Sequence, residues 1–245
     1  MKSIILCEGS SDFSLLQYYM RKVYGWEYSN SHTINLDNIR RSATFRKEAD
    51  LMSIGGCGGC NRIIPALGDV LESNTITTAG EQFDKVVIIT DRDEIETEDK
   101  FIDDIQALCD EYQINLLDTL ENDKWISAEY ENGHGRKQLL QLLLLVIPFE
   151  ETGAMETFLL NAIAQNDEYD AEIIRKSNQF VDNIDQEKRY LTKRRYITKS
   201  KFDVYFSVRT AAEQFVERQN ILKSVPWEQY GMIQREFEKL NELSD

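Results

Sequence analysis

Histidine and cysteine are scarce in this chain of 245 residues, which holds 2 histidines and 4 cysteines. Cys57 and Cys60 are spaced like a metal or redox pair, but no second cysteine pair and no histidine at finger spacing follows them. The sequence therefore argues against a structural zinc site. A dithiol function stays open as an alternative, although the four glycines around the pair favour close approach of the backbone to a neighbouring strand or anion.

Long hydrophobic runs are also missing. The longest, residues 142–147, is far too short to span a bilayer. The apolar residues after Lys2 form too short a run for a signal peptide. We therefore expect a cytoplasmic protein that makes no membrane contact, and the sequence leaves the oligomeric state open.

Positively charged residues are few, since the chain has 28 lysines and arginines against 43 acidic residues and a net charge of −15. This balance argues against a free-standing nucleic-acid binder, whose affinity comes mainly from neutralising phosphates. It does not exclude an enzyme that meets a polyanion through a local basic patch. One dense basic stretch, residues 188–201, is either a solvated helix face or a patch that contacts DNA or RNA. Its candidate nucleic-acid-binding residues are Lys193, Arg194, Arg195 and Lys199.

The most informative stretch is residues 86–94, in which four β-favouring apolar residues lead into a cluster of acids. Such a short apolar run predicts a strand buried on both faces. Asp91 and Asp93 would point to the same side of that strand, because side chains alternate with a period of two. A hard divalent cation such as Mg²⁺ would relieve their repulsion. The simpler alternative is a solvated acidic turn.

Acidic residues follow the first predicted strand in the same way. Residues 3–7 predict a strand, Gly9 a tight turn, and Ser10 or Ser11 the cap of a helix. Glu8 would then lie at the strand tip and Asp12 in the first helical turn. Each has a simple explanation alone, as a surface turn residue and a dipole-favouring acid. If the two strands are adjacent, however, these carboxylates converge with Asp91 and Asp93.

The remaining pattern alternates strands and helices. We expect a second strand at residues 49–54, a helix from residue 63, a helix after Thr97, and a hairpin whose arms are residues 124–130 and 138–148. Residues 26–50 look irregular. A helix from Met155 places Glu156 in its first turn, and the chain beyond is mostly helical. The sequence therefore predicts an α/β core at residues 1–150 with a mostly parallel sheet, and a helical region at residues 151–245 packed on that core.

The order of these motifs resembles the TOPRIM domain, which topoisomerases, bacterial primases and OLD-family nucleases share. The resemblance rests on a strand followed by Glu8-Gly9-Ser10-Ser11-Asp12 and a helix, a glycine-rich loop after the second strand, and a strand followed by Asp91-Arg92-Asp93. It covers residues 1–110, and the segment from Pro148 to Glu156 looks like a later acidic motif. Small stand-alone TOPRIM proteins are the nearest likeness, because no ATPase, topoisomerase or primase module is evident.

The resemblance implies a Rossmann-like fold and Mg²⁺- or Mn²⁺-dependent cleavage of a phosphodiester. Glu8, Asp91 and Asp93 would hold one ion, with Asp12 assisting, and Glu156 would help to hold a second. Glu8 would alternatively serve as a general acid or base. The late lysine of the family maps to Lys201, with Lys199 as the second choice, and would neutralise charge on the phosphoryl group. A module that binds metal, nucleotide or a protein without turnover is the alternative function.

Overall fold

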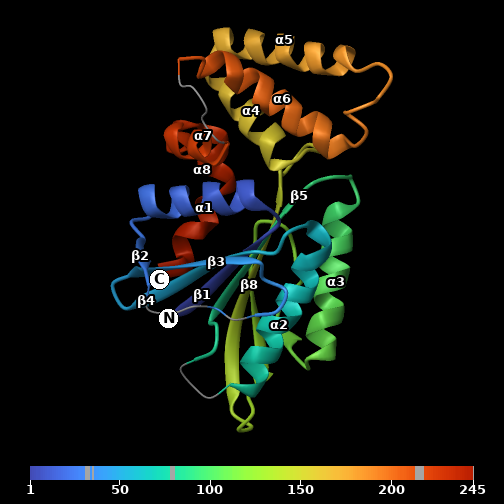
Figure 1. Cartoon of the computed structure of the whole chain (residues 1–245). Coiled ribbons are helices and arrows are strands. Elements are labelled where there is room, and N and C mark those ends of the chain that lie inside the picture. Colours follow the sequence, from blue (N-terminus) through green and yellow to red (C-terminus); the bar gives the residue numbers. More distant parts are fainter. Residues whose placement is uncertain (31–33, 35, 78–80, 213–217, 245) are drawn as a thin grey trace.

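A mixed eight-stranded sheet forms the centre of the protein (Figure 1). The computed structural model describes residues 1–30, 34, 36–77, 81–212 and 218–244. The strand order across the sheet is β2-β3-β4-β1-β5-β8-β7-β6. The strands are β1 (Lys2–Cys7), β2 (Glu27–Ser29), β3 (Arg41–Lys47), β4 (Asp50–Gly56), β5 (Lys85–Asp91), β6 (Asn115–Leu116), β7 (Trp125–Glu131) and β8 (Lys137–Ile147).

Only the four central strands are parallel. β1 pairs with β4 and β5, and β5 pairs with β8, all in parallel. The four outer pairings are antiparallel, so the expected mostly parallel sheet is corrected to a mixed one. The predicted hairpin accounts for β7 and β8. The segment expected to be irregular instead supplies β2 and β3, which pair in sequence beside β4.

Both faces of the central strands are buried, and each face has its own apolar core. On β1, β5 and β8 the residues Ile5, Val87 and Leu143 point into one core, and their neighbours Ile4, Val86 and Leu142 into the other. All six side chains are fully buried. This double burial explains why these strands read as continuous apolar runs rather than as alternating ones.

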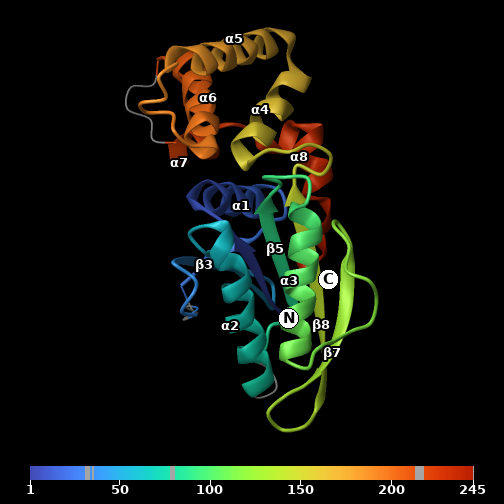
Figure 2. The ribbon, with the colours of Figure 1, turned by 90° about the vertical axis from the view of Figure 1, so that its right-hand side faces the viewer.

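Helices cover the two faces unequally (Figure 2). Helices α2 (Ile63–Ile76) and α3 (Thr97–Glu111) pack on one face, and α1 (Ser10–Lys22) packs on the other. Three further helices stand beyond the carboxyl ends of the parallel strands. They are α4 (Met155–Asn166), α5 (Glu168–Ile184) and α6 (Arg194–Arg209).

The last part of the chain returns to the α1 face of the sheet. It contains α7 (Arg218–Ser224), α8 (Gly231–Glu236) and three-residue and seven-residue 3-10 helices at Trp227–Gln229 and Glu238–Ser244. Tyr24 donates a hydrogen bond to the Phe237 carbonyl oxygen at 3.0 Å, and Trp125 donates to the Lys239 carbonyl oxygen at 3.3 Å. Among the helices within the described ranges, none is long and apolar enough to cross a bilayer.

Candidate active site

A pocket of about 560 Å³ opens at the carboxyl ends of the parallel strands, under α6. Open α/β sheets present their ligand sites at this edge. The pocket brings together all five predicted metal-binding carboxylates and a set of cations. The acidic lining residues are Glu8, Asp12, Asp91, Asp93 and Glu156, and the basic ones are Arg40, Arg41, Arg194, Arg195 and Lys199.

Adjacent strands bring Glu8 to Asp91. β1 and β5 are neighbours in register, with Cys7 opposite Ile89, so Glu8 follows β1 beside Thr90 and Asp91 at the end of β5. Glu8 Oε1 accepts hydrogen bonds from the Thr90 hydroxyl at 2.8 Å and from the Asp91 backbone N–H at 3.1 Å. The Glu8 side chain is therefore held against the tip of β5.

Asp91 in turn lies at the start of α4. Its Oδ1 accepts a hydrogen bond from the Met155 backbone N–H at 2.9 Å. Met155 is the first residue of α4, where backbone N–H groups lack partners within the helix and the helix dipole favours negative charge. Asp91 thus joins the tip of β5 to α4 and fixes the position of Glu156 in the first turn of that helix.

Asp12 and Glu156 complete the acidic floor. Asp12 Oδ2 accepts a hydrogen bond from the Gly9 backbone N–H at 2.7 Å, so the helix is capped by Asp12 and Gly9 and not by the predicted serines. Ser11 instead donates from its hydroxyl to Glu156 Oε1 at 3.2 Å. Asp12 is 6% exposed and Glu156 is 5% exposed. Two nearly buried acids from different helices therefore lie beside the strand tips.

The carboxylates raise one another's pKa. Burial is the main cause for Asp12, whose pKa rises from 3.8 to about 7, and the charge of Glu8 adds to it. The pKa of Asp91 is raised well above its ordinary value by burial and by the charges of Asp12, Glu8 and Glu156. Burial also raises the pKa of Glu8, although its bonds to Asp91 and Thr90 oppose the rise. Strongly perturbed, mutually repelling acids of this kind are typical of functional sites.

Carboxylate oxygens are the donors that Mg²⁺ and Mn²⁺ prefer, so the chemistry of this floor fits such an ion. The binding of one ion by Glu8, Asp91 and Asp93, with water bridges where needed, stays a prediction. Across the described residues, no three histidine, cysteine or acidic side chains are placed to hold one metal ion together. One oxygen each of Glu8, Asp12 and Asp91 accepts a hydrogen bond from a backbone N–H group. Binding would therefore require small side-chain rotations or bridging waters, and Mg²⁺ commonly keeps several of its waters.

Cations of α6 and of the β3 segment line the opposite side of the pocket. Arg194 donates a hydrogen bond to the Asp93 backbone oxygen, and its Nη1 lies 3.9 Å from Asp93 Oδ1. Asp93 is therefore paired with an arginine, whereas the other four acids form no ion pair with a cation of the described residues. Lys199 also lines the pocket, and its charge lowers the pKa of Asp12 against the effect of burial.

Two predicted basic residues lie elsewhere. Lys201 Nζ is 2.8 Å from Asp182 Oδ1 on α5, and Lys201 does not line the pocket. Of the two candidate lysines, Lys199 lines the pocket and Lys201 does not, because two residues along a helix point to different sides. Lys193 precedes α6, and its Nζ lies 6.0 Å from the centre of the Tyr196 ring rather than in the pocket.

Sequence reasoning missed several residues that build the site. Arg40 and Arg41 reach the pocket from a segment with no clear pattern. Arg92 is 8% exposed and holds the loop before α4, since Nε donates to the Pro148 carbonyl oxygen at 2.7 Å and Nη2 donates to Glu98. The alternation of Asp91, Arg92 and Asp93 could have indicated that Arg92 points away from the two acids.

A sequence model of one protein family matches residues 2–227, and its description is "Protein of unknown function (DUF3226)". The chain belongs to the DUF3226 family. The match spans the sheet, the acidic floor and helices α4 to α6. No curated protein matches this DUF3226 chain.

Among solved structures there is a likeness over the full length of the chain. The crystal structure of hypothetical protein PH0156 from Pyrococcus horikoshii OT3 matches with a TM-score of 0.54 and 14% identity, covering 100% of this chain and 99% of that one. At this identity the likeness shows the fold alone. A glyoxalase/bleomycin resistance protein/dioxygenase family enzyme from Burkholderia phytofirmans PsJN matches with a TM-score of 0.18 and 10% identity, covering 58% of this chain and 97% of that one. A TM-score this low does not indicate a common fold.

In this DUF3226 chain the loop that carries Cys57 and Cys60 packs against the backbone of Glu8. Gly58 and Gly59 donate their backbone N–H groups to the Glu8 carbonyl oxygen at 2.7 and 3.0 Å, which is the close approach that the glycines predict. Cys57 is buried, Cys60 is exposed, and both are free thiols. Burial raises the pKa of Cys57 to about 12, which disfavours the thiolate that dithiol chemistry needs.

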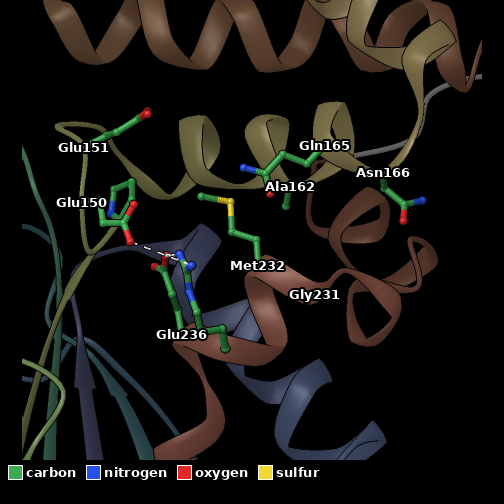
Figure 3. A pocket seen from close by; sticks show the side chains of 10 residues that line it. Glu150, Glu151, Ala162, Gln165, Asn166, Gly231, Met232 and Glu236 are labelled. Carbon is green, nitrogen blue, oxygen red and sulfur yellow. Dashed lines mark hydrogen bonds and ion pairs between the residues drawn. The ribbon is translucent and has the colours of Figure 1, made fainter.

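A second pocket, of about 440 Å³, lies behind the loop that precedes α4 (Figure 3). The end of α4 and helix α8 line it, and Met232 extends across it in the figure. Glu236 is 1% exposed there, and its Oε2 has no hydrogen-bond partner among the residues that the structure describes. Burial raises the pKa of Glu236 to about 7, while Arg235 and the Phe149 backbone amide oppose the rise.

Proposed function

We propose that this chain is a metal-dependent phosphodiester-cleaving protein of the TOPRIM type. The observation that carries the proposal is the meeting of five carboxylates, from two strand tips and two helix starts, in one pocket whose other side is basic. Acids and cations facing one another across a cleft suit a phosphate that is bridged to the acids by divalent ions. The cytoplasmic location, the TOPRIM assignment and the DNA or RNA substrate belong to this proposal.

Glu8, Asp12, Asp91, Asp93 and Glu156 would hold Mg²⁺ or Mn²⁺. When bound, such ions activate water and stabilise the leaving oxygen of a phosphodiester. Lys199, with Arg194 and Arg195, would bind the phosphate and neutralise charge that develops on it. Glu8 would be held against the tip of β5 by its bonds to Thr90 and Asp91. Burial raises its pKa, which favours a role as a general acid or base.

Cleavage of fluorescently labelled DNA and RNA in Mg²⁺, in Mn²⁺ and in EDTA tests the proposal. We expect cleavage in either metal, none in EDTA, and a loss of at least about a hundredfold in Asp91→Asn, as for the loss of a key electrostatic group. Asp103→Asn, on the exposed side of α3, is the matched control and should cleave like the wild type. Metal-dependent cleavage that survives in Asp91→Asn would refute the assignment of the site.

The two lysines of α6 give a second matched pair. Lys199→Ala should slow cleavage strongly, because Lys199 lines the pocket. Lys201→Ala should not, because Lys201 is paired with Asp182 outside it. The reverse result would restore the lysine that the sequence pattern first indicated.

The second candidate function is a module that binds metal, nucleotide or a protein partner without turnover. The net charge of −15 favours it, because so acidic a chain repels long polyanions. Calorimetry with Mg²⁺ and Mn²⁺ separates the two functions. Binding that is lost in Asp91→Asn, without cleavage of DNA or RNA by the wild type, would support the binding module.

A further inference from the structure

The loop between α5 and α6 is folded around one carboxylate. Asp185, just after α5, accepts hydrogen bonds from the backbone N–H groups of Arg189, Tyr190 and Leu191 at 3.0, 2.7 and 2.7 Å. These bonds lower the pKa of Asp185. Such a set of backbone contacts orders the loop before any partner arrives, which reduces the entropy lost on binding.

Two tyrosines lie beside arginines here, Tyr190 in this loop and Tyr196 in the first turn of α6. Tyr190 is 71% exposed, and the Arg189 guanidinium lies 5.4 Å from the centre of its ring. Tyr196 is 38% exposed, and the Arg195 guanidinium lies 5.1 Å from its ring centre. Arg195 also donates a hydrogen bond to the Tyr196 hydroxyl at 3.3 Å. Exposed aromatic rings beside arginines combine a stacking surface with a phosphate-binding charge.

The charge of the segment is opposite to that of the chain. Residues 186–199 contain six lysines and arginines and one acid, Glu187, in a protein of net charge −15. The Tyr196–Arg195 pair also adjoins the acidic pocket, because Arg195 contacts Tyr196 and lines that pocket. A base stacked on Tyr196 would therefore lie next to the pocket that holds the carboxylates.

We propose that Tyr190 and Tyr196, with Arg189 and Arg195, form a platform that binds single-stranded nucleic acid and leads it to the acidic pocket. Unpaired bases expose the faces that stack on tyrosine, whereas a duplex buries them and offers mainly its phosphates. The arginines bind the phosphates between stacked bases. The inference rests on the proposed function only for the cleavage of the bound strand in the acidic pocket. Binding of the strand to the platform does not depend on cleavage.

Fluorescence anisotropy in EDTA tests the platform without cleavage. The probes are short fluorescein-labelled oligo(dT), oligo(U) and a DNA duplex of equal length. We expect the full chain to bind the single strands about tenfold more tightly than the duplex, and Tyr190→Ala and Tyr196→Ala each to weaken single-strand binding about tenfold. Tyr190→Phe should retain the affinity, because its ring still stacks. Tyr169→Ala removes a tyrosine that is 76% exposed on α5 and should change nothing.

The outcomes separate the two proposals. Equal affinity for duplex and single strand, or no effect of either tyrosine variant beyond that of Tyr169→Ala, would overturn the platform. Loss of cleavage in Asp91→Asn with unchanged single-strand affinity supports both proposals. Tight single-strand binding by a wild-type protein that never cleaves would overturn the proposed function and leave the platform standing.

Discussion

Replacing Asp12 with asparagine should stabilise this protein, and the gain should depend on pH. Asp12 is 6% exposed and is surrounded by Glu8, Asp91 and Glu156, so its negative charge is held in an unfavourable place. Its pKa rises from 3.8 to about 7 on folding, mainly through burial. At a pH above both values this difference costs about 4 kcal/mol of folding free energy, as an upper limit.

The sign of the pH dependence follows from that shift. Below pH 3.8 the carboxyl is protonated in the folded and unfolded chain alike, so it contributes no penalty. The penalty grows as pH rises toward about 7 and is constant above it. Asparagine carries no charge, and its side-chain oxygen can still accept the bond from the Gly9 N–H. The repulsion is spread over several neighbouring acids, so removing one charge should recover only part of this penalty. We expect Asp12→Asn to raise the free energy of unfolding by about 2 kcal/mol at pH 8 and by almost nothing at pH 4.

Thermal and urea denaturation in EDTA measure this gain. About 2 kcal/mol corresponds to a rise in Tm of about 4–8 °C for a chain of this size. Asp103→Asn, at an exposed position on α3, controls for the loss of one negative charge from an acidic protein. Equal effects of the two variants, or a loss of stability in Asp12→Asn at pH 8, would refute the view that the acidic floor is strained. Mg²⁺ at pH 8 should narrow the gap, because it would stabilise the wild type more than the variant.

Three further changes probe the fold and the pockets. Glu236→Gln should raise stability by about 1–2 kcal/mol at pH 8 and leave it unchanged at pH 4, because its pKa rises from 4.5 to about 7 on folding; urea denaturation at both pH values measures this. Gly58→Ala should cost about 1–3 kcal/mol, since Gly58 has φ +92° and a Cβ there would lie 2.6 Å from Arg40 Cδ; an unchanged Tm would contradict this. Leu144→Ala, in the core between β8 and helices α2 and α3, should cost about 3 kcal/mol, and a loss below about 1 kcal/mol by urea denaturation would mean that the core closes around the gap.

The sequence could predict the strands and helices whose buried residues form a recognisable hydrophobic pattern. β1, β5 and β8 are apolar on both faces and were evident as strands, as were the hairpin arms and the helices that follow them. β2 and β3 were missed because their few apolar residues, such as Ala43 and Phe45, lie among polar and basic neighbours. The antiparallel edges of the sheet therefore could not be foreseen.

The candidate site divides in the same way. Acids at strand tips could be found because each directly follows a recognisable strand, and strand adjacency brings Glu8 beside Asp91. Arg40 and Arg41 could not, because no periodicity positions them. The choice between Lys199 and Lys201 depends on the rotation of α6 about its axis, which is set by packing against α5. The tyrosine platform could not be predicted from the basic stretch, because the turn around Asp185 depends on backbone hydrogen bonds that leave no sequence pattern.

The contact between Arg194 and Asp93 has a consequence for how ligands would enter the pocket. Arg194 belongs to α6 and Asp93 to the loop after β5, so the site supplies one of its acids with an internal counter-ion. A phosphate that attracts Arg194 would leave Asp93 free to accept a divalent cation, and a cation at Asp93 would release Arg194 for the phosphate. The contact between Arg194 and Asp93 would then be replaced by two new ones, Arg194 with the phosphate and Asp93 with the cation. Each would raise the affinity for the other by the same factor, as thermodynamic linkage requires.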